Sequence, residues 1–348
     1  MERMDDANET MAYPGDGGGE SLPDLCLRLH AGQMMTWPLL AENSVALASV
    51  CERAFGLDGG TVNVVFNPGR INSTKADTDP AAVARRPCFL CPENRPREQE
   101  SILYLGEWLI LCNPYPIFPR HLTVVHREHR LQDIRGILGV LPGLARRLSP
   151  VWSVFFNGPL SGASAPDHLH LQAVPSGALP VETDSPSVWN LKTVHEREGV
   201  VLSFGTHAGR TLLTMEGARE EPLSRILIEV VDAMERVPPT PGKPMMNLLG
   251  RFRDGRWTLF LFPRRQGRPE VFFREGEEQI LVSPGTVEMA GTIITPREAD
   301  FLRMNEALIR QIYRDVSADA GAVEKVLDSF REHYLSSVSC AGKCPEEG

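Results

Sequence analysis

The sequence predicts an α+β protein with two lobes, and three observations lead to that prediction. The chain has 348 residues, which a prior of about 150 residues per domain divides into roughly two domains. Short β-branched or apolar runs alternate with amphipathic helical patterns in both halves of the chain. The composition, with 42% hydrophobic and 23% charged residues, is that of an ordinary globular protein.

The first part of the sequence predicts a tail, a helical region and one short strand. Residues 1–21 should form a flexible tail, because the run Gly15-Asp16-Gly17-Gly18-Gly19 cannot bury apolar surface. The pattern from residue 23 to residue 57 is mostly helical. Residues 61–66 are rich in β-branched side chains and end at Asn67-Pro68-Gly69, which predicts a strand followed by a turn.

The middle of the sequence is rich in strand patterns. Between the strands predicted at 121–125 and 151–156, apolar residues recur every three or four positions from residue 134 to residue 148. This spacing predicts a helix, which Pro142 should kink or split. The predicted strands cover residues 108–112, 121–125, 151–156 and 168–174.

The second half repeats this mixture of strands and helices. Residues 200–204 and 211–215 predict a hairpin, and residues 222–237 predict an amphipathic helix. Thr295-Pro296-Arg297-Glu298 has the residues of a helix N-terminus, with Thr as the cap. Further strands are expected at 246–252, 257–262 and 270–273, and a final helix at 322–334. The expected organisation is a tail at 1–21, an N-terminal lobe at 22–180, a C-terminal lobe at 181–338 and a second tail at 339–348.

Charge and cysteine content restrict the class of protein. Asp and Glu total 45 against 36 Lys and Arg, a net charge of −9, which argues against the basic surface that nucleic-acid binding requires. No apolar run reaches the ~18–20 residues of a membrane helix, and the acidic N-terminus lacks the features of a signal peptide. The cysteines number seven, which is odd and sparse and favours a reduced, cytoplasmic protein without a disulfide framework.

The strongest functional motif is His168-Leu169-His170-Leu171-Gln172, which follows a loop of small residues from Ser161 to Ser164. Alternate residues of a strand share a face, so the two imidazoles and the amide should point one way and the leucines into the core. Such a set suits a site where an anionic group is attacked and held. A plain polar strand face near the surface is the alternative. Neither a P-loop nor a Gly-x-Gly-x-x-Gly fingerprint is present in the sequence.

A second motif, Cys88-Phe89-Leu90-Cys91, has the spacing of half a zinc site or of a redox pair. The following residues, 92–96, begin no good helix, which disfavours a thioredoxin-like redox site. A closed structural zinc site needs four ligands, and His129 and His168 are the candidates to complete a Cys₂His₂ set. A plain loop, or a site that no longer binds metal, is the alternative.

These motifs resemble those of the histidine-triad superfamily, specifically its nucleotidyltransferase and phosphorylase branch. That branch includes galactose-1-phosphate uridylyltransferase, diadenosine tetraphosphate phosphorylase and GDP-hexose phosphorylases. The His-x-His-x-Gln run is similar to its active-site strand, and the Cys-x-x-Cys segment is similar to the zinc-binding pair of the uridylyltransferases. The segments similar to an uncharacterised bacterial family related to these enzymes are 67–70, 88–99, 113–129, 157–172 and 283–285.

The resemblance covers roughly residues 60–315 and has several implications. It implies two histidine-triad-like lobes, each an antiparallel sheet packed with helices. His170 would be the nucleophile, and Gln172 would contact the bound phosphoryl group. One structural zinc per chain would be held by Cys88, Cys91, His129 and His168. The phosphate pocket would be lined by Asn157, Ser161, Gly162 and Ser164, with Arg70 as a further phosphate-binding candidate.

Two departures from the relatives limit what the resemblance implies. Three residues separate Ser164 from His168, where several relatives have two, so the role of this serine is less secure. The C-terminal half contains no His-x-His pair. The second metal site of the uridylyltransferases, and their galactose specificity, therefore have no support in this sequence.

The sequence thus predicts a nucleotidyltransferase or phosphorylase. It would cleave a nucleoside diphosphate sugar or a dinucleoside polyphosphate through a covalent nucleotidyl-His170 intermediate, with phosphate or a sugar 1-phosphate as acceptor. A histidine-triad nucleotide hydrolase and a non-catalytic nucleotide-binding zinc protein are the alternatives. The expected partners are the nucleotide or nucleotide-sugar substrate and, as in related enzymes, a second copy in a homodimer, with no nucleic acid and no membrane.

Overall fold

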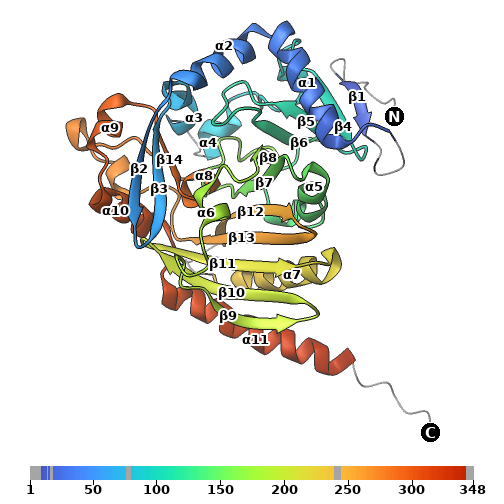
Figure 1. The fold of residues 1–348 in the computed structure, drawn as a ribbon, viewed down its shortest axis with the longest axis vertical. Coiled ribbons are helices and arrows are strands. Elements are labelled where there is room, and N and C mark those ends of the chain that lie inside the picture. Colours follow the sequence, from blue (N-terminus) through green and yellow to red (C-terminus); the bar gives the residue numbers. More distant parts are fainter. Residues whose placement is uncertain (1–8, 14, 16–18, 76–79, 239–243, 342–348) are drawn as a thin grey trace.

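The computed structural model describes residues 9–13, 15, 19–75, 80–238 and 244–341. A sheet of 11 strands and a sheet of three strands are packed with helices (Figure 1), so the predicted α+β class is confirmed. The first half of the chain supplies β1 (Glu9–Tyr13), β2 (Cys51–Leu57), β3 (Gly60–Phe66), β4 (Ser101–Tyr104), β5 (Trp108–Cys112), β6 (Leu122–His126), β7 (Trp152–Asn157) and β8 (His170–Pro175). The second half supplies β9 (Lys192–Arg197), β10 (Val200–His207), β11 (Arg210–Gly217), β12 (Met245–Arg253), β13 (Arg256–Arg264) and β14 (Thr292–Thr295).

The helices lie between these strands along the chain. The longer ones are α1 (Leu22–Thr36), α2 (Pro38–Ala46), α5 (Leu141–Leu148), α7 (Glu220–Arg236), α10 (Glu306–Val316) and α11 (Ala320–Ala341). The shorter ones are α3 (Ile71–Lys75), α4 (Pro80–Ala84), α6 (Pro180–Thr183), α8 (Thr286–Met289) and α9 (Glu298–Arg303). Within the described ranges, no helix combines the length and the apolarity that crossing a bilayer requires.

The large sheet repeats one arrangement in its two halves. Its strand order is β1-β4-β5-β6-β8-β7-β12-β13-β11-β10-β9. Apart from the edge strand β1, each half has five strands, and the fifth along the chain inserts between the third and the fourth: β8 between β6 and β7, and β13 between β11 and β12. One helix, α5 or α7, connects the third of these strands to the fourth. The halves meet where β7 pairs antiparallel with β12, with Asn157 opposite Asn247. The two expected sheets are therefore joined edge to edge into one.

Each face of the large sheet packs against a different set of elements. One face carries Val154 and Leu171, and it packs against α1, α5, α7 and α11. The opposite face carries Phe155, Val174 and Phe262, and it packs against the small sheet β14-β3-β2 and against α10. Because side chains alternate along a strand, adjacent residues of β8 contribute to two separate cores.

Several local predictions differ from the structure in the first half. Residues 9–13, which were expected within a flexible tail, form β1 and pair parallel with β4. Residues 51–57 form a strand rather than a helix end, because their backbone pairs with β3 along its whole length. Strand β8 begins at His170 rather than at residue 168, since Asp167 and His168 lie in a turn.

Three further differences lie in the second half. Thr295 ends β14 and donates to the carbonyl of Val65, so it does not cap a helix; α9 begins three residues later with Arg297 as its N-cap. Residues 270–272 form a 3₁₀ turn rather than a strand. Helix α11 continues to Ala341, into the expected second tail, and residues 342–348 lie outside the described residues.

Candidate functional site

The four predicted metal ligands come together at the end of the large sheet nearest β6 and β8. Cys88 and Cys91 lie on a turn before a short 3₁₀ segment, His129 follows β6, and His168 precedes β8. Their ligand atoms all lie within 4.8 Å of one another. The side chains of Leu109, on β5, and Val125, on β6, pack beneath the cysteine turn and hold it on the sheet.

The arrangement of these donors fits a tetrahedral cation. Cys88 Sγ lies 3.3 Å from His168 Nδ1, and Cys91 Sγ lies 3.1 Å from His129 Nδ1 and 3.6 Å from His168 Nδ1. Zinc–ligand bonds of about 2.0–2.3 Å give separations of roughly 3.3–3.8 Å between the donors of a tetrahedron. Burial raises the pKa of both thiols, so thiolates at this position need a cation beside them.

A hydrogen bond from its other ring nitrogen orients the imidazole of His168. Its Nε2 lies 2.7 Å from the carbonyl oxygen of His126 and donates to it, which leaves Nδ1 unprotonated and aimed at the two sulfurs. Fixing the second ring nitrogen in this way is the usual arrangement for a metal-ligating histidine. Cys88 is held in turn, because the side-chain amide of Asn94 donates to its carbonyl at 2.9 Å.

His170, the first residue of β8, is buried and has a defined tautomer. Its Nδ1 lies 2.8 Å from the carbonyl oxygen of His168 and donates to it, so Nε2 keeps its lone pair. Among the described residues, Nε2 has no hydrogen-bond partner. Burial lowers the pKa of His170 to about 4, so the imidazole is neutral near pH 7 and has the form of a nucleophile.

Gln172 is oriented by His121, which was not among the predicted site residues. His121 accepts from the Ile117 N–H through Nδ1 at 3.3 Å, so its Nε2 carries the proton and donates to Gln172 Oε1 at 2.9 Å. Burial lowers the pKa of His121 to about 3, which agrees with this neutral tautomer. The amide N–H₂ of Gln172 is thereby turned away from His121 and is available to a ligand.

A second glutamine, also missed from the sequence, fixes the backbone around His170. Gln132 Oε1 accepts from the His170 N–H at 2.8 Å. Its Nε2 donates to the carbonyls of Asn157 and His170, at 2.8 and 3.1 Å. One buried side chain therefore joins the start of β8 to the end of β7, which sets the spacing between His170 and Asn157.

Asn157 lies where the two halves of the sheet meet. Its Oδ1 accepts from Asn247 Nδ2 at 3.0 Å and from the Thr286 N–H at 2.7 Å. Because the Thr286 N–H can only donate, the oxygen of Asn157 is on that side and its Nδ2 is on the other. Among the described residues Nδ2 has no partner, and the side chain lines a small cavity with Gln172.

This cavity contains four of the five predicted substrate-binding residues. Its volume is about 50 Å³, and its lining includes Arg70, Asn157, Gly162, Ser164 and Gln172. Ser161 is the exception: it is fully buried, and its side chain is not part of the lining. Its carbonyl accepts from Asn247 Nδ2 at 2.7 Å, so Ser161 joins the small-residue loop to β12.

Two loops from opposite halves of the chain touch at this cavity. Gly162 has φ = +89°, and a Cβ there would lie 2.6 Å from Gly285 Cα. A Cβ on Gly285 would in turn lie 2.9 Å from Asn157 Oδ1. Only glycine permits both the left-handed conformation and this backbone approach, so the Ser161–Ser164 loop and the Ser283-Pro284-Gly285 loop form one wall.

Two arginines near the cavity, Arg70 and Arg264, are held by fixed partners. Arg70 donates to the Tyr115 carbonyl at 2.8 Å, and its charge opposes the effect of burial on Glu288, whose pKa is raised. Arg264, the last residue of β13, is fully buried. Its guanidinium donates to the carbonyls of Pro284, Gln266 and Gly267 at 2.9–3.1 Å, so it holds the loops rather than a ligand.

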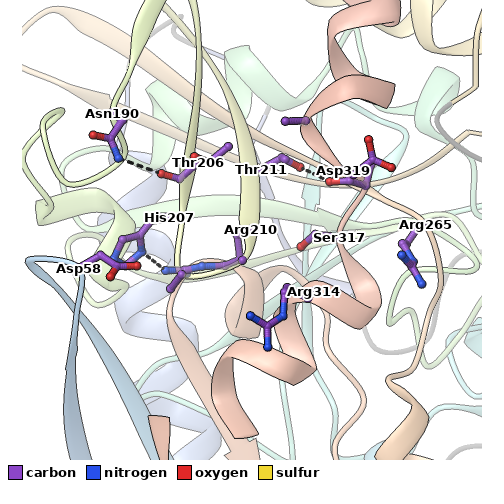
Figure 2. Close-up of a pocket in the computed structure, with 14 residues that line it drawn as sticks. Asp58, Asn190, Thr206, His207, Arg210, Thr211, Arg265, Arg314, Ser317 and Asp319 are labelled. Carbon is purple, nitrogen blue, oxygen red and sulfur yellow. Dashed lines mark hydrogen bonds between the residues drawn. The ribbon is translucent and has the colours of Figure 1, made fainter. Parts of the chain in front are cut away.

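A larger cavity, of about 500 Å³, lies at the turn between β10 and β11 (Figure 2). Arg210 lies there between the rings of Trp189 and Tyr313 and donates to His207 Nδ1 at 2.6 Å. His207 Nε2 donates to the Leu57 carbonyl at 2.6 Å. Both nitrogens of this histidine are therefore used within the protein, so the part of the chain that the structure describes offers this cavity no imidazole nucleophile despite its size.

Comparisons with known proteins agree with the fold. The chain matches a family model described as "Domain of unknown function (DUF4922)" over residues 29–175. It has no significant match among curated protein sequences. The yeast Ap4A phosphorylase Apa2 is similar in structure at 15% identity and a TM-score of 0.55, over 87% of this chain and 97% of that one. The same yeast protein in complex with Ap4A is similar at 13% identity and a TM-score of 0.56, over 86% and 98%.

An ADP-glucose phosphorylase from Arabidopsis thaliana with bound ADP-glucose is also similar, at 15% identity over 78% of this chain and 100% of that one. Its TM-score of 0.36 is too low to establish a shared fold. The structural similarity to the yeast phosphorylase confirms the resemblance that the motifs predict, at the level of the fold.

Proposed function

We propose that this protein is a nucleotidyltransferase of the phosphorylase type that acts through a nucleotidyl-His170 intermediate. The observation that carries the proposal is the state of His170: Nδ1 is bonded to the His168 carbonyl and Nε2 is left with a lone pair. The fold supports it, since it is that of a yeast protein described as an Ap4A phosphorylase, one structure of which contains AMP. The substrate class would be a dinucleoside polyphosphate or a nucleoside diphosphate sugar.

In the first step, the lone pair of His170 Nε2 attacks the α-phosphorus of the donor. The N–P bond forms, the P–O bond to the leaving group breaks, and the leaving group takes the electron pair of that bond. The proton on Nδ1 stays on the ring, where the His168 carbonyl at 2.8 Å stabilises the positive charge. In the second step, an oxygen of phosphate or of a sugar 1-phosphate attacks the phosphorus, and the N–P electron pair returns to Nε2.

Donors already in place would stabilise the charge on the phosphoryl oxygens. The Gln172 amide is fixed by His121, and Asn157 Nδ2 is fixed because its oxygen is held by Asn247 and Thr286. Arg70 and Ser164 line the same cavity. Donors that are oriented before the reaction need no reorganisation when charge develops, which is the largest single contribution in many transfer enzymes.

We also propose that Cys88, Cys91, His129 and His168 hold one zinc ion per chain. Four protein ligands leave no open position, so the ion would be structural. When bound, it would fix the turn that precedes β8, and with it the position of the carbonyl that accepts from His170 Nδ1. Asn157, Gly162, Ser164 and Arg70 would bind the phosphoryl groups, with Ser161 acting only through the backbone of its loop.

Product analysis tests this function. The protein would be incubated with diadenosine tetraphosphate, ATP, UDP-sugars and ADP- and GDP-sugars, with and without inorganic phosphate. We expect at least one donor to be cleaved only when phosphate is present, with phosphate incorporated into the nucleotide product. The control is His333→Ala, which removes an exposed imidazole from α11. Undiminished turnover by His170→Ala would contradict the mechanism, and equal cleavage without phosphate would identify a hydrolase.

A further inference from the structure

Next to the cavity that contains Gln172 lies a second, more open one of about 220 Å³. The two share four lining residues, Ser73, Gly162, Ser164 and Ser283. They therefore lie side by side, and the two together are called the groove below. Its inner end has the donors Asn157 and Gln172, and its outer end has Leu160 and Phe273.

The outer end of this groove presents two large apolar side chains to solvent. Phe273 is 69% exposed and Leu160 is 56% exposed. Single exposed apolar residues are ordinary, but these two come from loops more than a hundred positions apart and line the same cavity. Exposing both at one place is unfavourable in the free protein, and a flat apolar ligand would cover them.

The backbone that carries these side chains is held in place. The Phe273 N–H donates to the Glu270 carbonyl at 3.0 Å, and the Glu270 N–H donates to Asp315 Oδ2 at 3.1 Å. A Cβ at Gly267 would lie 2.6 Å from the Leu160 carbonyl oxygen, so the two loops are in direct contact. An apolar surface on a fixed backbone costs little entropy when a ligand packs on it.

Arg268 links the apolar outer end of the groove to its inner end. Its guanidinium lies over the ring of Phe272, 4.2 Å from the ring centroid. The same group donates to Ser283 Oγ at 3.2 Å and to the Thr74 carbonyl at 3.3 Å. Ser283 and Thr74 both line the inner cavity. The Arg268 side chain therefore sets the distance between Phe272 and the loops that line this cavity.

We propose that Leu160 and Phe273 form the nucleobase-binding platform of the groove. This inference rests on the proposed function, which places the α-phosphoryl group at Gln172 and Asn157. The groove then passes hydroxyl groups at Ser73, Ser164 and Ser283, which suit a ribose, before it reaches the apolar pair. Any nucleobase can stack on an aromatic ring without specific hydrogen bonds, because every base has a π-face.

The test compares ligands that share a phosphate but differ in the base. Equilibrium binding of AMP, GMP, CMP and UMP would be measured beside ribose 5-phosphate and glucose 1-phosphate. The proteins would be wild type, Phe273→Ala, Phe273→Trp and Leu160→Ala. Leu302→Ala, which removes another exposed leucine at a distance from the groove, is the matched control.

We expect Phe273→Ala to weaken binding of the preferred nucleoside monophosphate by about 5- to 150-fold, the range that base–aromatic stacking gives. Ribose 5-phosphate should bind Phe273→Ala and wild type equally, and Phe273→Trp should retain nucleotide affinity. Leu160→Ala should weaken the nucleotide to a smaller degree, and Leu302→Ala should change nothing.

Three results would overturn the inference, and they separate it from the proposed function. If wild type binds a nucleotide and Phe273→Ala binds it equally well, the platform is wrong and the function stands. If Phe273→Ala weakens only glucose 1-phosphate, the outer end binds the acceptor instead. If wild type binds none of the four nucleotides, the proposed function fails and the inference fails with it.

Discussion

The two halves of the large sheet have the same strand order, but corresponding strands carry polar side chains on one face in the first half and apolar side chains there in the second. In the first half, β8 presents His170 and Gln172 on the face that also carries Val174. In the second half, β13 occupies the corresponding position in the sheet and presents Phe260 and Phe262, which are buried in an apolar core. The same framework therefore supports a polar site in one half and a packed core in the other.

The histidines on the connecting turns show the same contrast. His121, at the start of β6, uses one nitrogen on the Ile117 backbone and the other to turn an amide toward a cavity. His207, at the end of β10, uses one nitrogen on the Leu57 carbonyl and the other on Arg210. A buried histidine indicates a functional site when its partners leave polar atoms for a ligand. Cavity volume is a poorer guide, because the larger cavity lies beside His207.

The largest expected effect comes from His170→Ala in the first half. We expect kcat to fall by at least about 10³-fold, because the group that forms the covalent bond is removed. The melting temperature should fall only modestly, because the variant loses one hydrogen bond, from Nδ1 to the His168 carbonyl, and Nε2 has no partner among the described residues. Steady-state rates and thermal unfolding on the same samples check this. An activity loss that is matched by unfolding would mean that the residue is structural.

Removal of the cysteine pair tests the proposed metal site of the first half. The Cys88→Ser/Cys91→Ser variant should lose one zinc ion per chain and several kilocalories per mole of stability, because metal affinity is coupled to folding. Elemental analysis and thermal unfolding give both quantities. A metal-replete wild-type protein that contains no zinc would refute the metal site and leave the role of His170 unaffected.

Phe262→Ala should have the reverse profile of His170→Ala. Phe262 is fully buried in the core, so its truncation should lower the free energy of unfolding by about 3–5 kcal/mol. Turnover at a temperature where the variant is folded should be within a few-fold of wild type. Denaturant unfolding measures the loss. A selective loss of kcat in this variant would mean that the second half contributes to the chemistry.

In the proposed mechanism His121 would position Gln172, so its replacement should have a smaller effect. His121→Phe removes the donor to Gln172 Oε1, so we expect kcat to fall by about 10- to 100-fold. His121→Gln retains an N–H donor and should restore part of the activity. If His121 were only structural, both variants would lose activity in proportion to the fraction of protein that is unfolded. The kcat and KM of the folded protein would then be unchanged.

The smallest effect concerns pH. Because burial holds the pKa of His121 at about 3 in the folded protein, the unfolded chain takes up a proton below about pH 6.5 that the folded protein does not. The free energy of unfolding should therefore fall as the pH drops below 6.5, by on the order of 1 kcal/mol from this residue. Urea unfolding at pH 7 and pH 5 should show a smaller drop in His121→Gln. An equal drop in the two proteins would contradict this assignment.

Local sequence was sufficient to predict the cysteine pair of the candidate metal site and the strand that carries His170, with His129 and His168 as candidates to complete the set of ligands. The spacing of Cys88 and Cys91, and the alternation around His170, follow from residue types within a few positions. The sequence also indicated that both halves mix strands and helices. It did not predict that β7 and β12 join the halves into one sheet, because that contact links residues about 90 positions apart.

The residues that were missed act over similar distances. Gln132 is important because its amide bonds residues 25 and 38 positions away. Arg264 lies in an Arg-rich segment that looks like a solvated turn, yet its partners include the carbonyl of Pro284 in a different loop. The resemblance implied that Ser161 would line the phosphate pocket. Its neighbour Gly162 takes that place, since its φ of +89° turns the loop.

Intact-protein mass spectrometry tests the central claim most directly. Wild type and His170→Ala would each be incubated, without an acceptor, with ATP, diadenosine tetraphosphate, UDP-sugars, ADP-sugars and GDP-sugars. The account predicts a nucleoside-monophosphate adduct on wild type only, which is lost when phosphate or a sugar 1-phosphate is added. An adduct of equal yield on His170→Ala, or turnover of a donor by that variant at the wild-type rate, would contradict it.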